Sequence, residues 1–451
     1  VNAEGGGIRS AYWTALVLDR LATDVPDFRT RAFSFSGVSG GSLGLAVDRI
    51  CANKPTPADR QHCLDRLANA DLITPLISTW LFEDVLAQIL PTSISSGFCK
   101  SPACGVLSRG VRFEDAIVRA VPGIEAGIVA SRKGAHQPYL FLNSTWVESG
   151  ERAIASDIFI DWYDFPAARD QLALRQPGVD LSLATAAHNS ARFPFINAIG
   201  ALEGMDGVCP PDPPRGTTPA ATTTGKKKAA VCGHLADGGY FDNSGGHTTA
   251  DILNGLARYL SAPPKTAGNE SSQEFLAWDW ARRTLAPQVI QIRNGIHPDA
   301  DERPNCDKSK PPSTADEVKT MRHDRASDLY QPGRPGCDGE MKLYGEVLGP
   351  IVTAINTTGI GANGKLSEAD LWHRITSFCA QRVGNKPPVA NIDLIEDGRF
   401  LYPLGWHLSP IAREGMQQQA ADKRLLDRVS GVPIGTAVPE TGHVSSPPVI
   451  R

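Results

Sequence analysis

The fold is decided by residues 32–41, which read Ala-Phe-Ser-Phe-Ser-Gly-Val-Ser-Gly-Gly. Ala32–Phe35 is a short apolar run, which is typical of a buried strand, and a glycine-rich turn follows it. Ser42–Ile50 then has the pattern of a helix. A strand, a tight turn and a helix in this order predict an α/β protein with parallel strands.

The remainder of the chain alternates in the same way. Ala11–Leu21 has apolar residues at helical spacing ahead of the first strand. Further strands are predicted at Tyr139–Val147, within Ile154–Tyr163, at His234–Ala236 (the end of a strand), at Gln288–Arg293 and at Asn391–Ile395. Further helices are predicted at Leu181–Ser190, Thr248–Leu260, Leu343–Asn356 and Ser367–Arg382. We therefore expect a central, mostly parallel sheet flanked by helices.

Two polar stretches interrupt this pattern. Residues 203–231 are rich in Pro, Thr, Gly and Lys, and residues 299–340 are polar and proline-rich, so both are predicted to be long loop insertions. Residues 1–294 form a predicted core, and residues 295–451 form a predicted C-terminal extension that packs on it. Only Val1-Asn2-Ala3 precedes the loop Glu4-Gly5-Gly6-Gly7, and three residues are too few for a complete buried strand, so we expect further sequence upstream of Val1.

Composition excludes several classes of function. The chain has 451 residues, 41% of them hydrophobic and 21% charged, which is ordinary for a globular protein. Its formal charge of −4 gives no electrostatic reason to expect a nucleic acid partner. No uncharged apolar run approaches the roughly 18 residues of a membrane-spanning helix. No spacing of His, Cys, Asp and Glu indicates a metal site.

The glycine-rich turn contains the first motif with chemical meaning. Gly37-Val38-Ser39-Gly40-Gly41 fits the pattern G-x-S-x-G between a strand and a helix, which is the context of a nucleophile elbow. The small neighbours permit a sharp turn, and the helix N-terminus favours negative charge developing at the Ser39 hydroxyl. Such turns also bind phosphate or simply pack tightly, so this motif alone does not establish catalysis.

A second glycine-rich motif lies at the start of the chain. It reads Glu4-Gly5-Gly6-Gly7-Ile8-Arg9-Ser10 and precedes a predicted helix. Consecutive glycines let the backbone approach a substrate and direct N–H groups at a developing oxyanion. The lysine of a Walker loop and the last glycine of a dinucleotide-binding loop are both missing. Arg9 has a simpler interpretation as the partner of a structural ion pair.

The third motif follows the strand that ends at Ala236. It reads Asp237-Gly238-Gly239-Tyr240-Phe241-Asp242-Asn243. A carboxylate on a tight turn after a buried strand is held rigidly and can take a proton from a serine. By itself the motif is more typical of an ordinary Asp-Gly turn.

Together and in this order, the three motifs resemble the patatin-like phospholipase family, in its bacterial form. The helix and turn at 186–195 and the position of Asn243 agree with the resemblance, which extends from Val1 to about Arg293. The resemblance implies a three-layer α/β fold, a catalytic core over 1–294 and no cofactor. It also implies hydrolysis of lipid acyl esters, as a phospholipase A, lysophospholipase or esterase.

The resemblance also implies a role for each motif residue. Ser39 would be the nucleophile and Asp237 its base, and backbone amides of Gly6, Gly7 and Ile8 would form the oxyanion hole. Supporting positions are Gly5, Arg9, Gly37, Gly41, Gly238, Gly239 and Asn243. Glu4 and Ser10 depart from the family's usual Asp and Gly, which puts only the local loop geometry in question.

Two alternatives remain open. A conventional α/β-hydrolase with a Ser–Asp–His triad needs a histidine after the acid, and His247 and His297 are available. A non-catalytic lipid-binding module is the alternative outside the enzymes, although such a module has no need of both Ser39 and Asp237. An assay with a short chromogenic ester separates an enzyme from a binding module.

One segment and the resemblance point to a membrane surface as a partner. Apolar residues near helical spacing could cover the site or enter the lipid interface: Leu76, Ile77, Trp80, Leu81, Val85, Leu86, Ile89 and Leu90. The simpler interpretation is a helix that faces the core.

The nine cysteines indicate the compartment. Eight form neighbouring pairs across loop-like stretches, where a disulfide constrains the chain most: Cys51–Cys63, Cys99–Cys104, Cys209–Cys232 and Cys306–Cys337. Cys379 is left over inside a predicted helix. This placement predicts disulfides and a catalytic domain that is exported, periplasmic or extracellular. Membrane association is expected from the apolar segment and the resemblance. The alternative is nine reduced cysteines in the cytoplasm.

Overall fold

The structure, a computed structural model, describes residues 1–79, 109–134, 137–173, 180–193, 196–197, 199–203, 231–263, 272–295, 368–383, 388–395, 402, 405–423 and 425. The predicted insertion at 299–340 and the predicted helix Leu343–Asn356 lie outside these residues, as do positions 204–230 of the first predicted insertion.

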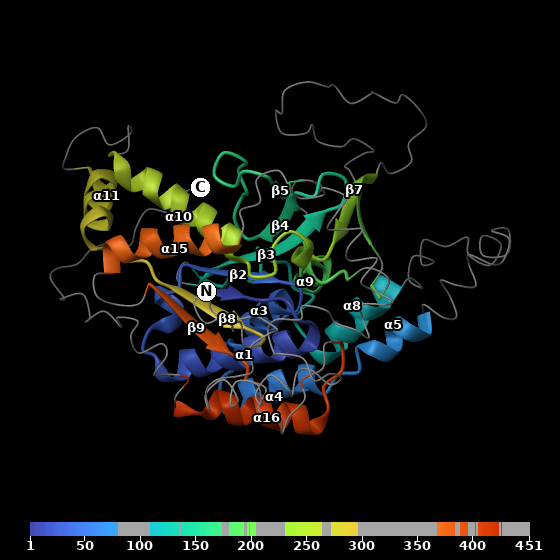
Figure 1. The fold of residues 1–451 in the computed structure, drawn as a ribbon. Helices are drawn as coiled ribbons and strands as arrows, with labels where there is room; N and C mark the ends of the chain where they lie inside the picture. The colour runs from blue at the N-terminus through green and yellow to red at the C-terminus, as the bar shows by residue number, and fades with distance from the viewer. Residues whose placement is uncertain are drawn as a thin grey trace, which may run out of the picture.

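An open, mostly parallel sheet forms the centre of the protein (Figure 1). The described strands are β1 (Asn2–Ala3), β2 (Ser34–Val38), β3 (Tyr139–Trp146), β4 (Arg152–Ser156), β5 (Ala168–Asp170), β6 (Gly200–Glu203), β7 (Val231–Ala236), β8 (Val289–Arg293) and β9 (Val389–Asp393). Their order is β5-β4-β3-β2-β1-β8-β9, with β7 beside β3 and β6 beside β7. From β3 to β9 every pairing is parallel, whereas β3–β4, β3–β7 and β6–β7 are antiparallel.

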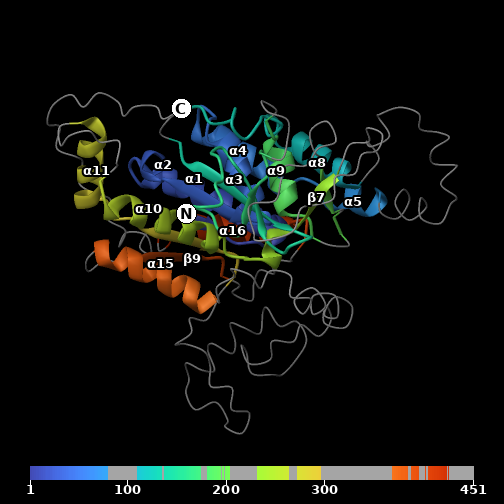
Figure 2. The same ribbon diagram turned by 90° about the horizontal axis from the view of Figure 1, so that it is seen from above.

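Helices cover both faces of the sheet and complete the three layers of an α/β fold (Figures 1 and 2). One face packs against α1 (Gly7–Asp24), α3 (Gly40–Cys51) and α9 (Leu183–Ser190). On the outer side of these helices lie α4 (Pro57–Ala68), α8 (Arg109–Ala120) and α16 (Pro410–Ala421). The other packs against α10 (Gly246–Ser261) and α15 (Glu368–Val383), and α11 (Gln273–Thr284) adjoins α10. Successive side chains of β8 point to opposite faces of the sheet. Ile290 and Ile292 pack into the core on the α1 and α3 side, and Val289 packs into the core on the α10 and α15 side. The predicted fold class is thus confirmed.

The residues ahead of the first glycine loop form a short strand in the middle of the sheet. Asn2 and Ala3 form the two-residue β1 between β2 and β8, with Asn2 opposite Ser36 and Ala3 opposite Gly37. Two parallel neighbours supply hydrogen bonds on both sides, which compensates for the short length. The predicted helix Ala11–Leu21 is α1, which begins earlier, at Gly7.

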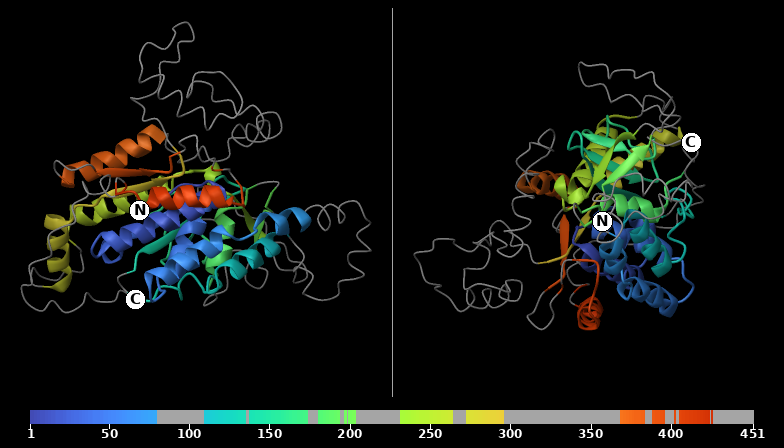
Figure 3. Two further views of the ribbon diagram at one scale, coloured as in Figure 1. Left: turned by 90° about the horizontal axis from the view of Figure 1, so that it is seen from below. Right: turned by 90° about the vertical axis from the view of Figure 1, so that its right-hand side faces the viewer.

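The described part of the C-terminal region joins the same layers. β9 adds a parallel strand beside β8, and α15 packs on α10. α16 lies along α1 (Figure 3). At this contact the Gln417 side chain donates to the Tyr12 hydroxyl at 2.9 Å. The boundary at residue 294 stays a prediction, since the described residues on its two sides share one sheet.

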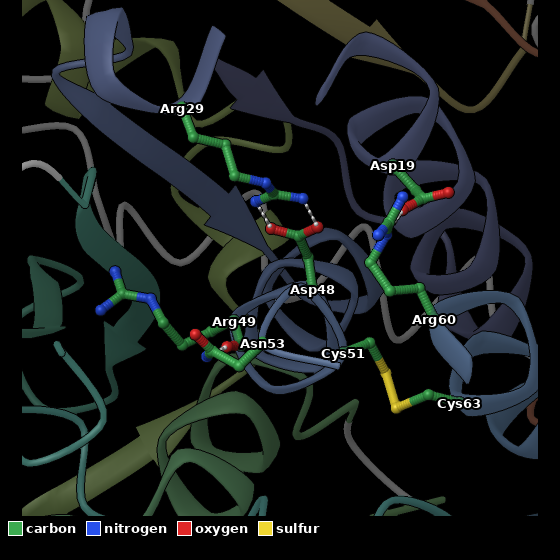
Figure 4. The surroundings of a disulfide bond; sticks show 8 residues. All are labelled: Asp19, Arg29, Asp48, Arg49, Cys51, Asn53, Arg60 and Cys63. Atoms are coloured by element: carbon green, nitrogen blue, oxygen red, sulfur yellow. Dashed lines mark hydrogen bonds and ion pairs between the residues drawn. A yellow bond between two sulfur atoms is a disulfide. The ribbon is translucent and has the colours of Figure 1, made fainter. Parts of the chain in front are cut away.

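A disulfide joins α3, the helix that follows the glycine-rich turn at 37–41, to the neighbouring helix α4. Cys51 ends α3, and its bond to Cys63 of α4 closes a loop with a sequence separation of 12 (Figure 4). Two ion pairs lie nearby: Arg29 binds both carboxylate oxygens of Asp48 at 2.7 Å, and Arg60 binds Asp19 at 2.8 Å. A loop of this length corresponds to roughly 3 kcal/mol of stabilisation.

The other cysteine predictions are tested only in part. Cys232 is disulfide-bonded, but its predicted partner, Cys209, lies outside the described residues. The predicted pairs Cys99–Cys104 and Cys306–Cys337 also lie outside them. Cys379 is a buried free thiol in α15, as predicted.

Little of the predicted membrane-facing segment is described. Leu76, in α5 (Ile73–Thr79), is fully buried, and the segment from Trp80 to Leu90 lies outside the described residues. None of the helices in the described ranges is both long and apolar enough to cross a bilayer.

Candidate active site

Ser39 occupies a strained turn between β2 and α3. Its φ of 51° and ψ of −123° are rarely adopted by a residue with a side chain, and such a conformation costs on the order of 1–3 kcal/mol. The turn places the hydroxyl at the carboxyl end of a parallel strand and at the N-cap position, just before the first residue of α3. Ser39 is only 8% exposed, so its hydroxyl lies in a largely water-free environment.

The buried Ser190 supports the strained turn. The Ser39 backbone N–H donates to Ser190 Oγ at 2.9 Å, and the Ser190 hydroxyl donates to the Asn143 carbonyl of β3. Ser42 Oγ of α3 lies 2.8 Å from the same hydroxyl. One side chain therefore connects the turn to α9, β3 and α3. Ser190 ends the predicted helix Leu181–Ser190, and no local pattern in the sequence indicates its contact with Ser39.

Asp237 is the hydrogen-bond partner of the Ser39 hydroxyl. Ser39 Oγ lies 2.7 Å from Asp237 Oδ2, across 198 positions of sequence. The other carboxylate oxygen, Oδ1, accepts the Gly239 N–H at 2.8 Å, so the Asp-Gly-Gly turn orients its own carboxylate. The backbone is held as well, because Thr145 Oγ1 donates to the Asp237 carbonyl and Asp237 N–H donates to the Arg192 carbonyl.

Burial changes the proton affinity of this carboxylate. Asp237 is 5% exposed, and desolvation raises the pKa of its carboxyl group to about 6, against hydrogen bonds from Ser39 and Gly239 that lower it. The group is ionised at neutral pH but holds a proton better than an exposed aspartate does. A pKa close to the working pH is what a general base requires.

The first glycine loop lies beside the serine. Gly7 has a φ of 60° and Gly6 a φ of 152°, conformations that favour glycine. Both are partly exposed between the buried Gly5 and Ile8. Among the described residues, no acceptor binds the backbone N–H of Gly6 or Gly7. These two N–H groups are available to an incoming oxygen.

The predicted third donor, Ile8, is not available. The Ile8 N–H donates to the Gly405 carbonyl at 2.8 Å, so it has no hydrogen left for a substrate. This contact comes from a segment almost 400 positions away and has no signature near Ile8 in the sequence. The expected set of Gly6, Gly7 and Ile8 is therefore corrected to Gly6 and Gly7.

Glycine permits the loop and the turn to approach each other. A Cβ added at Gly40 would lie 1.9 Å from the Gly7 carbonyl oxygen, and one added at Gly5 would lie 3.1 Å from Ser39 Cβ. The supporting glycines are equally confined: a Cβ at Gly41 would lie 2.4 Å from the Ala3 carbonyl oxygen, at Gly37 2.8 Å from the Ser42 nitrogen, and at Gly238 2.1 Å from the Asn143 carbonyl oxygen.

Arg9 anchors the glycine loop from outside the site. Its guanidinium donates to the Tyr402 carbonyl at 2.6 Å and to Asn294 Oδ1 at 2.9 Å. Glu4 and Ser10, the two residues that differ from the patatin-like motif, contribute to the same anchor. Glu4 accepts the Asn294 N–H at 3.2 Å, and the Ser10 hydroxyl donates to the Glu4 carbonyl. These contacts give Arg9 a structural role.

Asn243 joins the third motif to the first. Its carbonyl accepts the Gly5 N–H at 3.1 Å, which holds the Asp237 turn against the glycine loop. Gly239 also lies next to the Asn243 side chain, because a Cβ added at Gly239 would lie 3.1 Å from Asn243 Oδ1.

The described histidines near the motifs, including the triad candidate His247, lie next to carboxylates other than Asp237. His188 Nδ1 lies 2.7 Å from Glu114 Oε1, His234 Nδ1 lies 2.6 Å from Glu148 Oε1, and His247 Nδ1 lies 3.2 Å from Asp242 Oδ2. Burial, together with Arg192, lowers the pKa of His188 to about 4. Within the described residues no imidazole hydrogen-bonds Ser39, and His297 lies outside them.

The described ranges hold no group of three His, Cys, Asp or Glu side chains close enough to bind a metal ion.

The fold and the geometry of the site define an α/β protein with a buried serine–aspartate pair beside a glycine loop. Searches of the chain against protein-family models and against curated proteins find no match.

Proposed function

We propose that this protein is a lipid acyl hydrolase of the patatin-like phospholipase type, acting as a phospholipase A, lysophospholipase or esterase. The observation that carries the proposal is the 2.7 Å hydrogen bond between Ser39 Oγ and Asp237 Oδ2. The free N–H groups of Gly6 and Gly7 beside that pair support it. The lipid nature of the substrate rests on the family resemblance of the motifs.

In the first step Ser39 Oγ attacks the acyl carbonyl carbon while Asp237 takes the hydroxyl proton. The carbonyl oxygen becomes an oxyanion and accepts hydrogen bonds from Gly6 and Gly7, whose positions require no reorganisation. The bond from the acyl carbon to the alcohol oxygen then breaks, and the alcohol leaves with the proton from Asp237. The acyl group remains as an ester on Ser39.

In the second step water replaces the alcohol. Asp237 takes a proton from the water as its oxygen attacks the acyl–serine ester. The same two N–H groups stabilise the second oxyanion. The fatty acid leaves, and the proton returns to Ser39 Oγ. One carboxylate thus serves as base and then as acid in each half of the cycle.

The test is hydrolysis of a short chromogenic ester by the wild type and by Ser39→Ala. We expect turnover and covalent labelling by a fluorophosphonate in the wild type, and neither in the variant, because only Ser39 supplies the nucleophile. Circular dichroism checks that the variant is folded. An active Ser39→Ala variant, or a wild type that neither turns over esters nor is labelled, contradicts the proposal.

The pH profile tests the base. Because burial raises the Asp237 pKa to about 6, the ionised form that accepts the proton is lost as the pH falls through 6. We expect kcat/KM to be level above about pH 7 and to fall close to tenfold per pH unit well below 6. Initial rates from pH 4 to 9 measure this, with folding checked at each pH. A level profile down to pH 4.5 would refute Asp237 as the base.

We also propose an exported location, periplasmic or extracellular, and action at a membrane surface. The Cys51–Cys63 disulfide supports an oxidising compartment. The family resemblance supports the lipid surface, where substrate in vesicles or micelles should be hydrolysed faster than monomers.

A further inference from the structure

The Asn243 side chain is exposed beside two buried catalytic candidates. Ser39 is 8% and Asp237 5% exposed, whereas Asn243 is an exposed residue in the turn that follows the aspartate. No hydrogen-bond partner binds its carboxamide among the described residues. A planar group with two unused N–H donors therefore borders the site on its solvent side.

Distances place this carboxamide next to both residues of the pair. A Cβ added at Gly5 would lie 2.3 Å from Asn243 Oδ1 and 3.1 Å from Ser39 Cβ. A Cβ added at Gly239 would lie 3.1 Å from both Asn243 Oδ1 and Asp237 Oδ1. Since positions 5 and 239 are glycines, neither contributes a side chain to the space between the carboxamide and the pair.

The backbone that carries the carboxamide is well fixed. The Asn243 carbonyl accepts the Gly5 N–H at 3.1 Å, and the next residue, Ser244, donates its N–H to Asp242 Oδ1 at 2.8 Å. These bonds involve the main chain of Asn243 or its neighbours, so a change of the Asn243 side chain leaves them in place. The side chain can be tested separately from the turn.

We propose that the Asn243 carboxamide binds the ester substrate by donating from Nδ2 to one of its oxygens. Its own oxygen faces Gly5 and Gly239, which leaves the N–H groups for the ligand. The acceptor is either the acyl carbonyl oxygen, which gains negative charge in the transition state, or a polar oxygen on the alcohol side. This inference rests on the proposed hydrolase function and adds a substrate-binding residue to it.

The test compares Asn243→Asp and Asn243→Ala with the wild type. Both variants lack the N–H donors, and only the first adds a charge near Asp237, so a shared loss reports the hydrogen bond. We expect kcat/KM to fall roughly 5- to 100-fold, as for the loss of one hydrogen bond. Asn69→Asp is the matched control, because Asn69 is exposed at the end of α4 and its amide donates to the Asp65 carbonyl.

Two substrates separate the possible acceptors: a short chromogenic ester with an apolar leaving group and a lysophospholipid. A fall in kcat with both identifies the acyl carbonyl oxygen, and a rise in KM with the lysophospholipid alone identifies the alcohol side. Wild-type kcat and KM for both substrates in both folded variants overturn the inference. Absence of hydrolysis by the wild type overturns the proposed function itself, which the chromogenic ester reveals before any variant is compared.

Discussion

Replacing Asp237 by asparagine is expected to lower kcat/KM for ester hydrolysis by roughly 10²–10⁴-fold, the usual contribution of a general base. Asparagine has nearly the same shape and can still accept the Gly239 N–H, but it cannot take the proton of Ser39 Oγ. The measurement is turnover of a short chromogenic ester at pH 8. His247→Gln is the comparison, because His247 is the one of the two triad candidates, His247 and His297, that lies within the described residues.

The thermal stability of Asp237→Asn shows whether a loss of activity comes from lost catalysis or from lost folding. Burial raises the Asp237 pKa above its ordinary value, so the ionised carboxylate costs folding free energy above about pH 6 and costs nothing once protonated at low pH. Asparagine removes that cost, and the Tm of Asp237→Asn at pH 8 should equal or exceed that of the wild type. A loss in His247→Gln as large as in Asp237→Asn would instead support a triad.

Replacing Gly40 by alanine is expected to lower kcat/KM by about 100-fold or more. The new Cβ would lie 1.9 Å from the Gly7 carbonyl oxygen, far inside any observed contact, so the glycine loop must move away from Ser39 by about 1 Å. A displacement of that size at an active site costs on the order of 10²-fold in rate. Crowding also destabilises the fold by about 1–3 kcal/mol.

Gly255→Ala is the matched control for this effect. Gly255 lies within α10, and the nearest atoms to its added Cβ are at 3.9 Å, so alanine fits and favours the helix. We expect wild-type activity and a slightly higher Tm. Fluorophosphonate labelling and circular dichroism of Gly40→Ala distinguish a displaced loop from an unfolded chain. A folded Gly40→Ala variant with full activity would show that the loop does not position the substrate carbonyl.

Local pattern was sufficient for several parts of the molecule. The apolar run before Gly37 and the helix after it were predicted near their observed positions as β2 and α3, because strand and helix periods are visible within ten residues. The apolar spacing of α1 and the buried free thiol Cys379 follow from the same kind of evidence. The disulfide Cys51–Cys63 also spans a short stretch, which made its pairing predictable.

Other features depend on contacts between distant residues. Asn2–Ala3 forms a strand only because β2 and β8 lie on its two sides. Ile8 was expected to face the substrate, but Gly405 occupies its N–H. The support of Ser39 by Ser190 joins residues 151 positions apart. No local pattern reports such contacts, because each residue involved is compatible with many neighbours.

The sequence by itself therefore determined the fold class and the residue types at the site: a serine in a glycine turn after a strand, and an aspartate in a second such turn. These are local properties, since the turns require glycine wherever they occur in the chain. Only the tertiary structure decided that Ser39 Oγ and Asp237 Oδ2 lie 2.7 Å apart and that burial raises the pKa of the aspartate. Strand order sets that distance and the surrounding layers exclude the water, and both arise from packing of the whole chain.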